Sequence, residues 1–336
     1  MAQKISIATE NDAEQWNAAV ESAHHSTLFH TWNWLKIVEK HTDTTLYPLM
    51  CYKGTTLVAI YPVFVQKKMH IHVALSPTSG AYLPYLGPVI PGIEAMKQDN
   101  KESLSLFVQE AVDDFLFSQL KCKYVRIRTP PRLNDARPFK WSGYEVDPLY
   151  TYRINLKNGK EQVWEGFEKK LRSNIKKAIK EGIRIQAGGR EDIEFIHKSL
   201  SNRMTEQGLS TSGSIDYLYD LFDTFYPSNM KLFIALYEGQ KVAGNIVLFH
   251  KDVVYSWVGL SKSDIRGLSP NDLVQWDTIT WACNSGFDYY EIMDAGVDPR
   301  LRHFKSKYNP DIEIWYSALK YDSYHLKLLS NILKKT

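Results

Sequence analysis

The residues best suited to chemistry gather in one stretch, between Val253 and Pro310. A strand-like alternating run leads through a polar loop into a capped helix, then into a second strand ending on Asp294 and a short basic helix carrying Lys305. Such an order presents backbone amides and a helix N-terminus to a bound phosphate or acyl donor. The ammonium of Lys305 could stabilise developing negative charge, and a partly buried Asp294 could accept a proton. The plainer interpretation is a surface ion pair for Lys305 and a helix cap for Asp294.

A second feature is a strongly basic helix. Between Lys169 and Arg184 the chain holds seven basic residues and a single acid, Glu181. Helical spacing turns four apolar residues toward a core: Leu171, Ile175, Ala178 and Ile179. Much of another face is basic and includes Lys169, Arg172, Lys176 and Lys180. Spacing alone is typical of a solvated basic face, and the same cations would also suit an anionic ligand.

Both features resemble the Fem-type transferases, peptidoglycan-bridge aminoacyltransferase relatives within the GNAT acyltransferase superfamily. The basic helix carries an R-x-x-I-x-x-A-x-x-x-G pattern at Arg172, Ile175, Ala178 and Gly182. Phe304-Lys305 followed by Tyr308 is similar to the family's F-K-x-x-F/Y element. The resemblance implies that Lys305 stabilises the oxyanion formed when an amine attacks an ester or thioester, with Asp294 orienting the amine or taking its proton. It also implies substrate contacts from Arg172, Lys176 and Tyr308.

The donor would meet the loop before the helix that starts at Pro270. In the superfamily a Q/R-x-x-G-x-G/A loop presents backbone N–H groups to the pyrophosphate of acyl-CoA. The corresponding run here is DIRGLSPND, which has Arg266 and Gly267 but lacks a second glycine at the expected spacing, while Ser269 and Asn271 could cap the helix. The resemblance thus implies a donor site at these four residues, with acyl-CoA ahead of aminoacyl-tRNA as co-substrate. An ordinary helix start would explain them equally well.

Four further residues are candidates for substrate binding. Lys36 lies in a region that resembles the T-x-x-W segment of related proteins, where a lysine meets an acceptor's phosphates. Tyr82 and Tyr85 lie in a segment rich in Pro and Gly, and such loops often rim a groove. Tyr255 alternates with Trp257 on a predicted strand, so one face of that strand lines either the core or a cleft.

The length of 336 residues predicts two domains. Both halves combine helices, a hairpin and a further strand, and the strand pairs LMCYKGTTLVAIYPVFV and FIALYEGQKVAGNIVLF resemble each other. We therefore expect an α/β fold of two tandem GNAT-like modules, 1–148 and 149–336, each a mixed sheet flanked by helices. Predicted helices include 102–120, 164–180, 191–207, 215–225 and 270–283, with a strand meander from 230 to about 260 and a last helix from Tyr324.

Composition excludes several classes of protein. The net charge of +3 is too small to argue for DNA binding. The three cysteines are far apart and support no disulfide framework or zinc site, and the histidines lack partners at ligand spacing, so no metal is expected. The start has no signal-peptide pattern and no apolar run reaches 18 residues, which predicts a cytoplasmic protein.

The predicted activity is transfer of an acyl group from acyl-CoA to an amine of a cell-envelope precursor, nucleotide-linked sugar or peptide. Two alternatives remain open: an aminoacyl-tRNA-dependent transferase, and a binding protein that has kept the fold without the chemistry.

Overall fold

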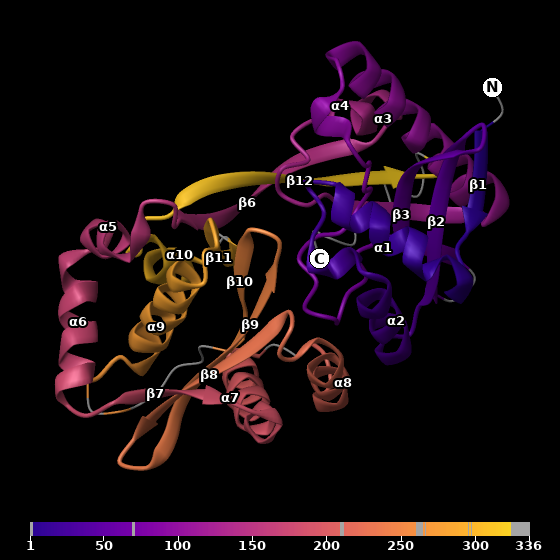
Figure 1. Cartoon of the computed structure of the whole chain (residues 1–336). Helices are drawn as coiled ribbons and strands as arrows, with labels where there is room; N and C mark the ends of the chain where they lie inside the picture. The colour runs from indigo at the N-terminus through magenta and orange to yellow at the C-terminus, as the bar shows by residue number, and fades with distance from the viewer. Residues whose placement is uncertain are drawn as a thin grey trace. The chain divides into compact units, whose positions relative to one another are not determined.

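The computed structural model describes residues 3–68, 71–208, 212–259, 265, 267–294, 296 and 298–323. The chain forms two compact units, one made of Met1–Leu149 with Ile314–Thr336 and the other of Tyr150–Glu313 (Figure 1). The sequence prediction kept residues 149–336 together, whereas the last strand groups with the first unit. The last strand belongs to the first unit because Ser317–Tyr321 pairs antiparallel with Tyr124–Arg128 of that unit.

The first unit is a mixed sheet with helices, as predicted. Its strand order is β1-β2-β3-β4-β5-β12, antiparallel except for the parallel pair β4–β5. The predicted hairpin within LMCYKGTTLVAIYPVFV is confirmed: β2 and β3 pair antiparallel, and Gly54 has a φ of +66° in the turn between them. The strands are β1 (Gln3–Ile7), β2 (Thr45–Lys53), β3 (Thr56–Lys68), β4 (Ile71–Ser76), β5 (Cys122–Arg128) and β12 (Asp311–Tyr321). The helices are α1 (Ala13–Ser22), α2 (Trp32–His41), α3 (Gln98–Asp113), which continues as a π-helical turn (Asp114–Gln119), and α4 (Arg137–Trp141).

The second unit repeats this plan. Its strand order is β6-β11-β10-β9-β8-β7, and its one parallel pair among the described strands is β10–β11, joined through α9. The strands are β6 (Glu145–Asn155), β7 (Arg184–Gly188), β8 (Met230–Tyr237), β9 (Gln240–His250), β10 (Val253–Gly259) and β11 (Tyr289–Asp294). The helices are α5 (Gly159–Gly166), α6 (Lys169–Lys180), α7 (Ile193–Glu206), α8 (Ile215–Phe225), α9 (Pro270–Asn284) and α10 (Pro299–Ser306).

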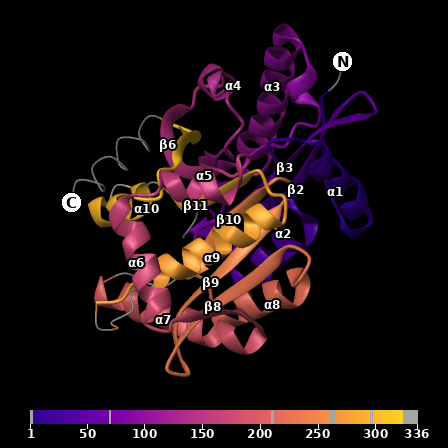
Figure 2. The same cartoon turned by 60° about the vertical axis from the view of Figure 1, so that its left-hand side comes forward.

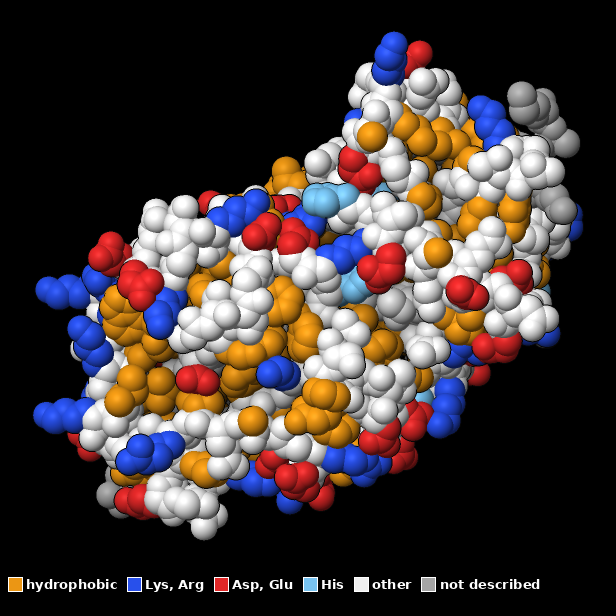
Figure 3. Space-filling view, viewed as in Figure 1, with side chains coloured by type: hydrophobic (Ala, Val, Ile, Leu, Met, Phe, Trp, Pro, Cys, Tyr) orange, Lys and Arg blue, Asp and Glu red, His pale blue; other side chains and the backbone are white. Residues whose placement is uncertain are grey.

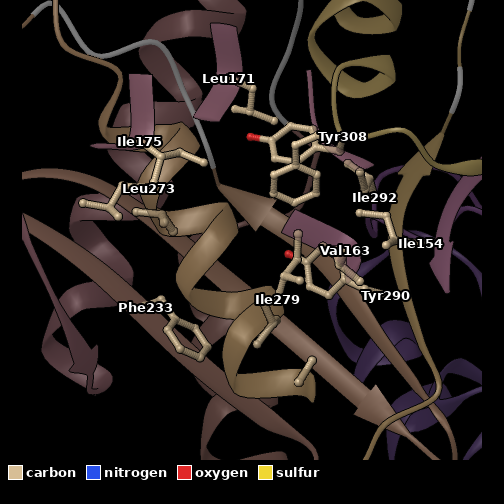
Figure 4. Packing of buried hydrophobic residues seen from close by; sticks show 14 of the residues in the cluster. Ile154, Val163, Leu171, Ile175, Phe233, Leu273, Ile279, Tyr290, Ile292 and Tyr308 are labelled. Carbon is tan, nitrogen blue, oxygen red and sulfur yellow. The ribbon is translucent and has the colours of Figure 1, made fainter. Parts of the chain in front are cut away.

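The core of the second unit lies between the sheet and the helices α5, α6 and α9. Figure 2 shows α9 lying along the strands β8 to β10. Fully or almost fully buried side chains from these elements interlock, among them Ile175 from α6, Ile279 from α9 and Tyr290 from β11 (Figure 4). This packing fixes the start of α9 against α6, and both elements border the site described below.

The basic helix differs from its prediction in two respects. The expected helix 164–180 is broken, because Phe167 and Glu168 adopt extended backbone angles between α5 and α6. The side chain of Phe167 is buried against the rings of Trp276 and Tyr308, which requires the chain to turn there. Ile179, expected in the core, is 54% exposed. It lies one residue beyond Ala178, where the buried stripe of α6 ends.

Two other predictions concern termini and spans. The helix expected from Tyr324 onward lies outside the described residues. Over the part of the chain that the structure does describe, every helix is too short or too polar to cross a membrane.

Candidate functional site

A cavity opens where the two parallel strands of the second unit stop pairing. Strands β10 and β11 pair from Val253–Tyr289 to Tyr255–Glu291. The residues that follow on both strands line a cavity of about 400 Å³ together with parts of α7, α9 and α10. Its lining residues are Arg203, Asn245, Ser256, Trp257, Val258, Gly259, Asn271, Ile292, Met293, Arg300, Leu301, Phe304 and Lys305. The cavity therefore lies at the carboxyl ends of the parallel pair, the edge at which α/β sheets commonly bind ligands.

A bulge in β10 shapes one wall of this cavity. The pairing of β10 with β9 shifts register between Ser256 and Val258, so Trp257 is the extra residue. A bulge turns a side chain away from the alternation of a regular strand, and Ser256, Trp257 and Val258 all line the cavity. The strand ends at Gly259, whose φ of +133° favours glycine and whose missing Cβ would lie 2.3 Å from the carbonyl oxygen of Gly244.

The described lining of the cavity is positively charged. It contains Arg203, Arg300 and Lys305 and no carboxylate. Arg300 pairs with Asp298 at 3.1 Å, whereas Arg203 makes no ion pair within the described residues. The side chain of Asp294, the predicted proton acceptor, lies outside the described residues, although its backbone ends β11. Cations beside apolar walls suit a ligand that carries both an anionic group and an apolar part.

Lys305 reaches the cavity from α10. This helix begins at Pro299, where the carboxylate of Asp298 accepts a hydrogen bond from the backbone N–H of Arg300 at 2.8 Å. The Nζ of Lys305 donates to the carbonyl oxygen of Met293 at 3.2 Å, which holds the ammonium at the end of β11. Lys305 thus lies beside the separated strands, and its catalytic role stays a prediction.

A buried ion pair fixes α10 against the start of α9. Asp272, the third residue of α9, is 2% exposed and accepts from the Nζ of Lys307 at 2.6 Å. The same carboxylate accepts from the hydroxyl of Tyr308 at 3.2 Å and from the amide of Asn174 in α6 at 3.3 Å. We call Asp272, Lys307, Tyr308 and Asn174 the α9 latch. Sequence reasoning missed it because nothing in the local pattern links positions so far apart.

Tyr308 differs from its predicted role. It is 1% exposed, and its ring packs edge-on against Phe167 and Phe304. Burial and the neighbouring Asp272 carboxylate raise the pKa of its hydroxyl well above the ordinary value. Tyr308 therefore packs against α10 and does not line the cavity beside Lys305. Tyr255 is likewise buried, at 3% exposure, within the paired part of β10.

A second buried charge group anchors the paired part of β11. Glu291 is fully buried and accepts from Thr151 Oγ1 at 2.9 Å and from an Nη of Arg153 at 3.0 Å. The other Nη of Arg153 pairs with Glu313 at 3.0 Å. The guanidinium of Arg153 thus pairs with two carboxylates and links β6 to β11 at Glu291, one residue before the cavity lining begins at Ile292.

The predicted donor loop is only partly described. Arg266 lies outside the described residues. The carbonyl oxygen of Gly267 is 3.5 Å from the Nζ of Lys177, and Ser269 occupies the N-cap position of α9 without a side-chain cap bond. Asn271 lines the cavity. Of the four predicted donor residues, Asn271 is the described one that the structure brings together with Lys305.

The cations of α6 lie on its outer side. Lys176 is exposed, with its Nζ 5.9 Å from the centre of the Trp164 ring, and Arg172 is half-buried. Neither lines the cavity beside Lys305. Figure 3 shows Lys and Arg side chains along the edge of the molecule that α6 occupies. Five lysines of this helix are exposed and make no ion pair within the described residues: Lys169, Lys170, Lys176, Lys177 and Lys180.

The remaining predicted residues belong to the first unit. Lys36 is paired with Glu39 on the surface of α2. Tyr85 is 1% exposed, and its ring meets those of Phe29 and Trp315 edge-on, so it is a core residue. Tyr82 has a φ of +48°, and burial raises the pKa of its hydroxyl to about 12. Of the two tyrosines predicted in the Pro/Gly-rich segment, Tyr82 is the one with a positive φ.

Comparison with known proteins agrees with this architecture. Residues 166–305 match the family model described as an acetyltransferase (GNAT) domain, a range that contains every lining residue of the cavity. Curated proteins gave no match. Among solved structures, FemX superposes with a TM-score of 0.71 at 14% identity over 93% of this chain and 96% of FemX. The chain has a Fem-like GNAT acyltransferase fold.

Two further structures share this Fem-like fold. L-PGS from Bacillus licheniformis has a TM-score of 0.59 at 16% identity, covering 96% of this chain and 97% of its own. A tandem GNAT protein from the clavulanic acid biosynthesis pathway has a TM-score of 0.57 at 9% identity, covering 96% and 99%. At these identities the likeness concerns the fold. The duplicated strand plan of the two units is therefore the tandem GNAT arrangement expected from the sequence.

Proposed function

We propose that this Fem-like GNAT protein transfers an acyl group from acyl-CoA to an amine, with the reaction in the cavity between β10 and β11. The observation that carries the proposal is the placement of Lys305, with Arg203 and Arg300, around the point where the parallel strands separate. The proposed acceptor is an amine of a cell-envelope precursor, a nucleotide-linked sugar or a peptide. Its anionic groups would be met by Arg203 and Arg300.

The proposed reaction is a direct displacement at the donor carbonyl. The neutral amine nitrogen attacks the carbonyl carbon, a C–N bond forms, and the carbonyl oxygen becomes an oxyanion beside the Lys305 ammonium. Collapse of this intermediate breaks the C–S bond and releases CoA as a thiolate, which takes up a proton. The proton lost by the nitrogen passes to Asp294 or to water. Holding both reactants in one cavity supplies the rest of the acceleration without a covalent enzyme intermediate.

The first experiment is thermal unfolding of the purified protein with and without acetyl-CoA and longer acyl-CoA esters. A ligand at one hundred times its dissociation constant stabilises by about 2.7 kcal/mol, which raises the melting temperature by several degrees. Unchanged melting with every ester would refute an acyl-CoA donor.

Substitution of Lys305 separates a catalyst from a binding protein. For Lys305→Ala we expect turnover to fall by about 10²–10³, the usual loss of one oxyanion-stabilising group. Donor affinity and melting temperature should change little, because the ammonium has a solvent-facing cavity beside it. A protein that binds ligands but shows no turnover before the substitution would be a binding protein.

A second candidate donor, aminoacyl-tRNA, is favoured by the five exposed lysines of α6. Replacing Lys169, Lys170 and Lys177 together with glutamine would weaken tRNA binding and reduce its dependence on salt by roughly one counterion for each lysine that contacts phosphate. Binding of acyl-CoA should change little. The matched control replaces Lys68, Lys97 and Lys121 of the first unit.

A further inference from the structure

The helix α10, which carries Lys305, has little packing of its own. The structure describes all eight of its residues, Pro299–Ser306, and none of them is buried. Phe304 and Lys305 are half-buried, and the others are exposed. A helix this short is marginal by itself and is normally held by burying one of its faces. The position of α10 must therefore depend largely on residues outside the helix.

The chain becomes fixed directly after α10, at two members of the α9 latch. Lys307 is the C-cap of α10 and is 14% exposed, and Tyr308 is 1% exposed. The backbone N–H of Tyr308 donates to the carbonyl oxygen of Lys305 at 3.2 Å. The carbonyl oxygen of Lys307 accepts from the backbone N–H of Glu168, the N-cap of α6, at 2.9 Å. Fixed contacts thus begin within two or three residues of Lys305.

The carboxylate of Asp272 joins this segment to the start of α9. Its Oδ1 accepts from the Nζ of Lys307 and the hydroxyl of Tyr308, and its Oδ2 accepts from the amide of Asn174. The preceding residue, Asn271, lines the cavity. A buried ion pair adds little net stability over an apolar pair of similar size, but its geometry is specific. The latch therefore fixes α10 in one arrangement against the wall of the cavity that α9 supplies.

The ammonium of Lys307 also contacts a residue that lines the cavity. Its Nζ lies 4.3 Å from the centre of the Phe304 ring, and Phe304 lines the cavity beside Lys305. A cation at this distance from an aromatic ring is attracted to it. The Lys307 ammonium thus connects Asp272 to the side of α10 that lines the cavity.

From these contacts we infer that Asp272 and Lys307 are positioning residues for acyl transfer, which hold α10 so that the Lys305 ammonium stays at the end of β11. That ammonium donates to the carbonyl oxygen of Met293 at 3.2 Å. A displacement of about 1 Å in an active site can cost about 10²-fold in rate. The inference rests on the proposed function and names two residues that act through Lys305 without lining the cavity.

A double-mutant cycle tests this inference. The assay follows the thiol released from acetyl-CoA, with hydroxylamine as the amine probe. In Lys307→Met we expect kcat to fall by about 10–10²-fold and the KM for acetyl-CoA to change by less than about threefold. When Lys305→Ala is already present, Lys307→Met should lower kcat by less than about threefold more, because the latch acts through the missing ammonium. Additive losses, or an unchanged kcat in Lys307→Met, would overturn the inference and leave acyl transfer standing.

Two further variants separate positioning from stability. Leu221→Ala removes a fully buried side chain from α8, which contributes no described residue to the cavity lining. This variant should lower the melting temperature as Lys307→Met does, yet keep its kcat. Asp272→Asn/Lys307→Met leaves no unpaired charge, so its melting temperature should largely recover while kcat stays at least about tenfold low. Recovery of kcat together with the melting temperature would overturn the inference, and this double variant decides if Lys307→Met fails to fold.

Hydrogen exchange of the whole chain distinguishes failure of the inference from failure of the proposed function. By mass spectrometry the amides of α10 should exchange at least about tenfold faster in Lys307→Met than in Leu221→Ala. Equal exchange in the two variants would overturn the inference whatever the turnover. Faster exchange, in a protein whose unaltered form shows no turnover, would support the placement of α10 by the latch and count against transfer from acetyl-CoA.

Discussion

Breaking the α9 latch should unfold the second unit at a markedly lower temperature. In Lys307→Met the stem of the side chain is kept but its charge is lost, so Asp272 stays buried at 2% exposure without the cation now 2.6 Å away. Breaking a buried ion pair by removing one partner costs about 3–5 kcal/mol. Lys307 is 14% exposed, and water can reach the site in part, so we expect the lower end, about 3 kcal/mol. For a unit of this size that is a fall of roughly 6–12 °C.

The assay is calorimetry, with urea unfolding to convert the shift into free energy. The matched control is Asp223→Asn, which breaks the pair with Arg190 at 2.8 Å in the same unit, where both side chains are about half exposed. An exposed pair is worth about 0–1 kcal/mol. The double variant Asp272→Asn/Lys307→Met should recover much of the loss, because it leaves no unpaired charge. A cost for Lys307→Met no larger than that for Asp223→Asn would refute the reasoning.

Three further predictions concern the same unit. Gly259→Ala should lower the melting temperature and impair donor binding, because its Cβ would stand 2.3 Å from the oxygen of Gly244; unchanged melting would contradict this. Burial, assisted by a nearby lysine, lowers the pKa of His250 from 6.5 to about 4. Between these two pH values the imidazole is protonated in the unfolded chain and neutral in the folded one. The free energy of unfolding therefore decreases as pH falls from 6.5 to 4. In His250→Gln the pH dependence of unfolding over that window should be shallower, and an unaltered slope would contradict the assignment. Ile175→Ala should cost about 2–5 kcal/mol and Ile179→Ala under about 0.5 kcal/mol, a difference that urea unfolding would measure and that equal costs would refute.

Local pattern was enough to predict most elements of the second unit. Helices with clear apolar periodicity or turn signals are confirmed. The helix predicted at 215–225 is observed as α8 (Ile215–Phe225), and the helix predicted at 270–283 is observed as α9 (Pro270–Asn284). The expected meander is confirmed, since β8, β9 and β10 pair antiparallel in sequence order. The strands β1, β4 and β12 were not predicted. The partners that stabilise them are distant in sequence, as the pairing of β12 with β5 illustrates.

The candidate site was predictable only in part. Motif resemblance found Lys305 and Asn271, which line the cavity. Motif resemblance could not reveal that Tyr308 is buried, because a tyrosine that follows a lysine in sequence occurs both in protein cores and in ligand-binding clefts. It also passed over Arg203, which stands in an ordinary amphipathic helix, and over Asp272, whose partner lies 35 positions away. Burial and long-range pairing decide these roles, and both arise only when the chain has folded.

The bond between Arg153 and Glu291 has a consequence for how this sequence can change over time. The two residues are 138 positions apart, yet each is nearly inaccessible. Without Arg153 the buried carboxylate of Glu291 would lose this cation, and without Glu291 the buried guanidinium would keep the partly exposed Glu313 as a carboxylate partner. A lineage that loses one should lose the other, or exchange both for an apolar pair, since the intermediate with one charge is the least stable form. In a family diverse enough to align, these positions should therefore vary as a couple. Glu313, which is 31% exposed, should drift more freely.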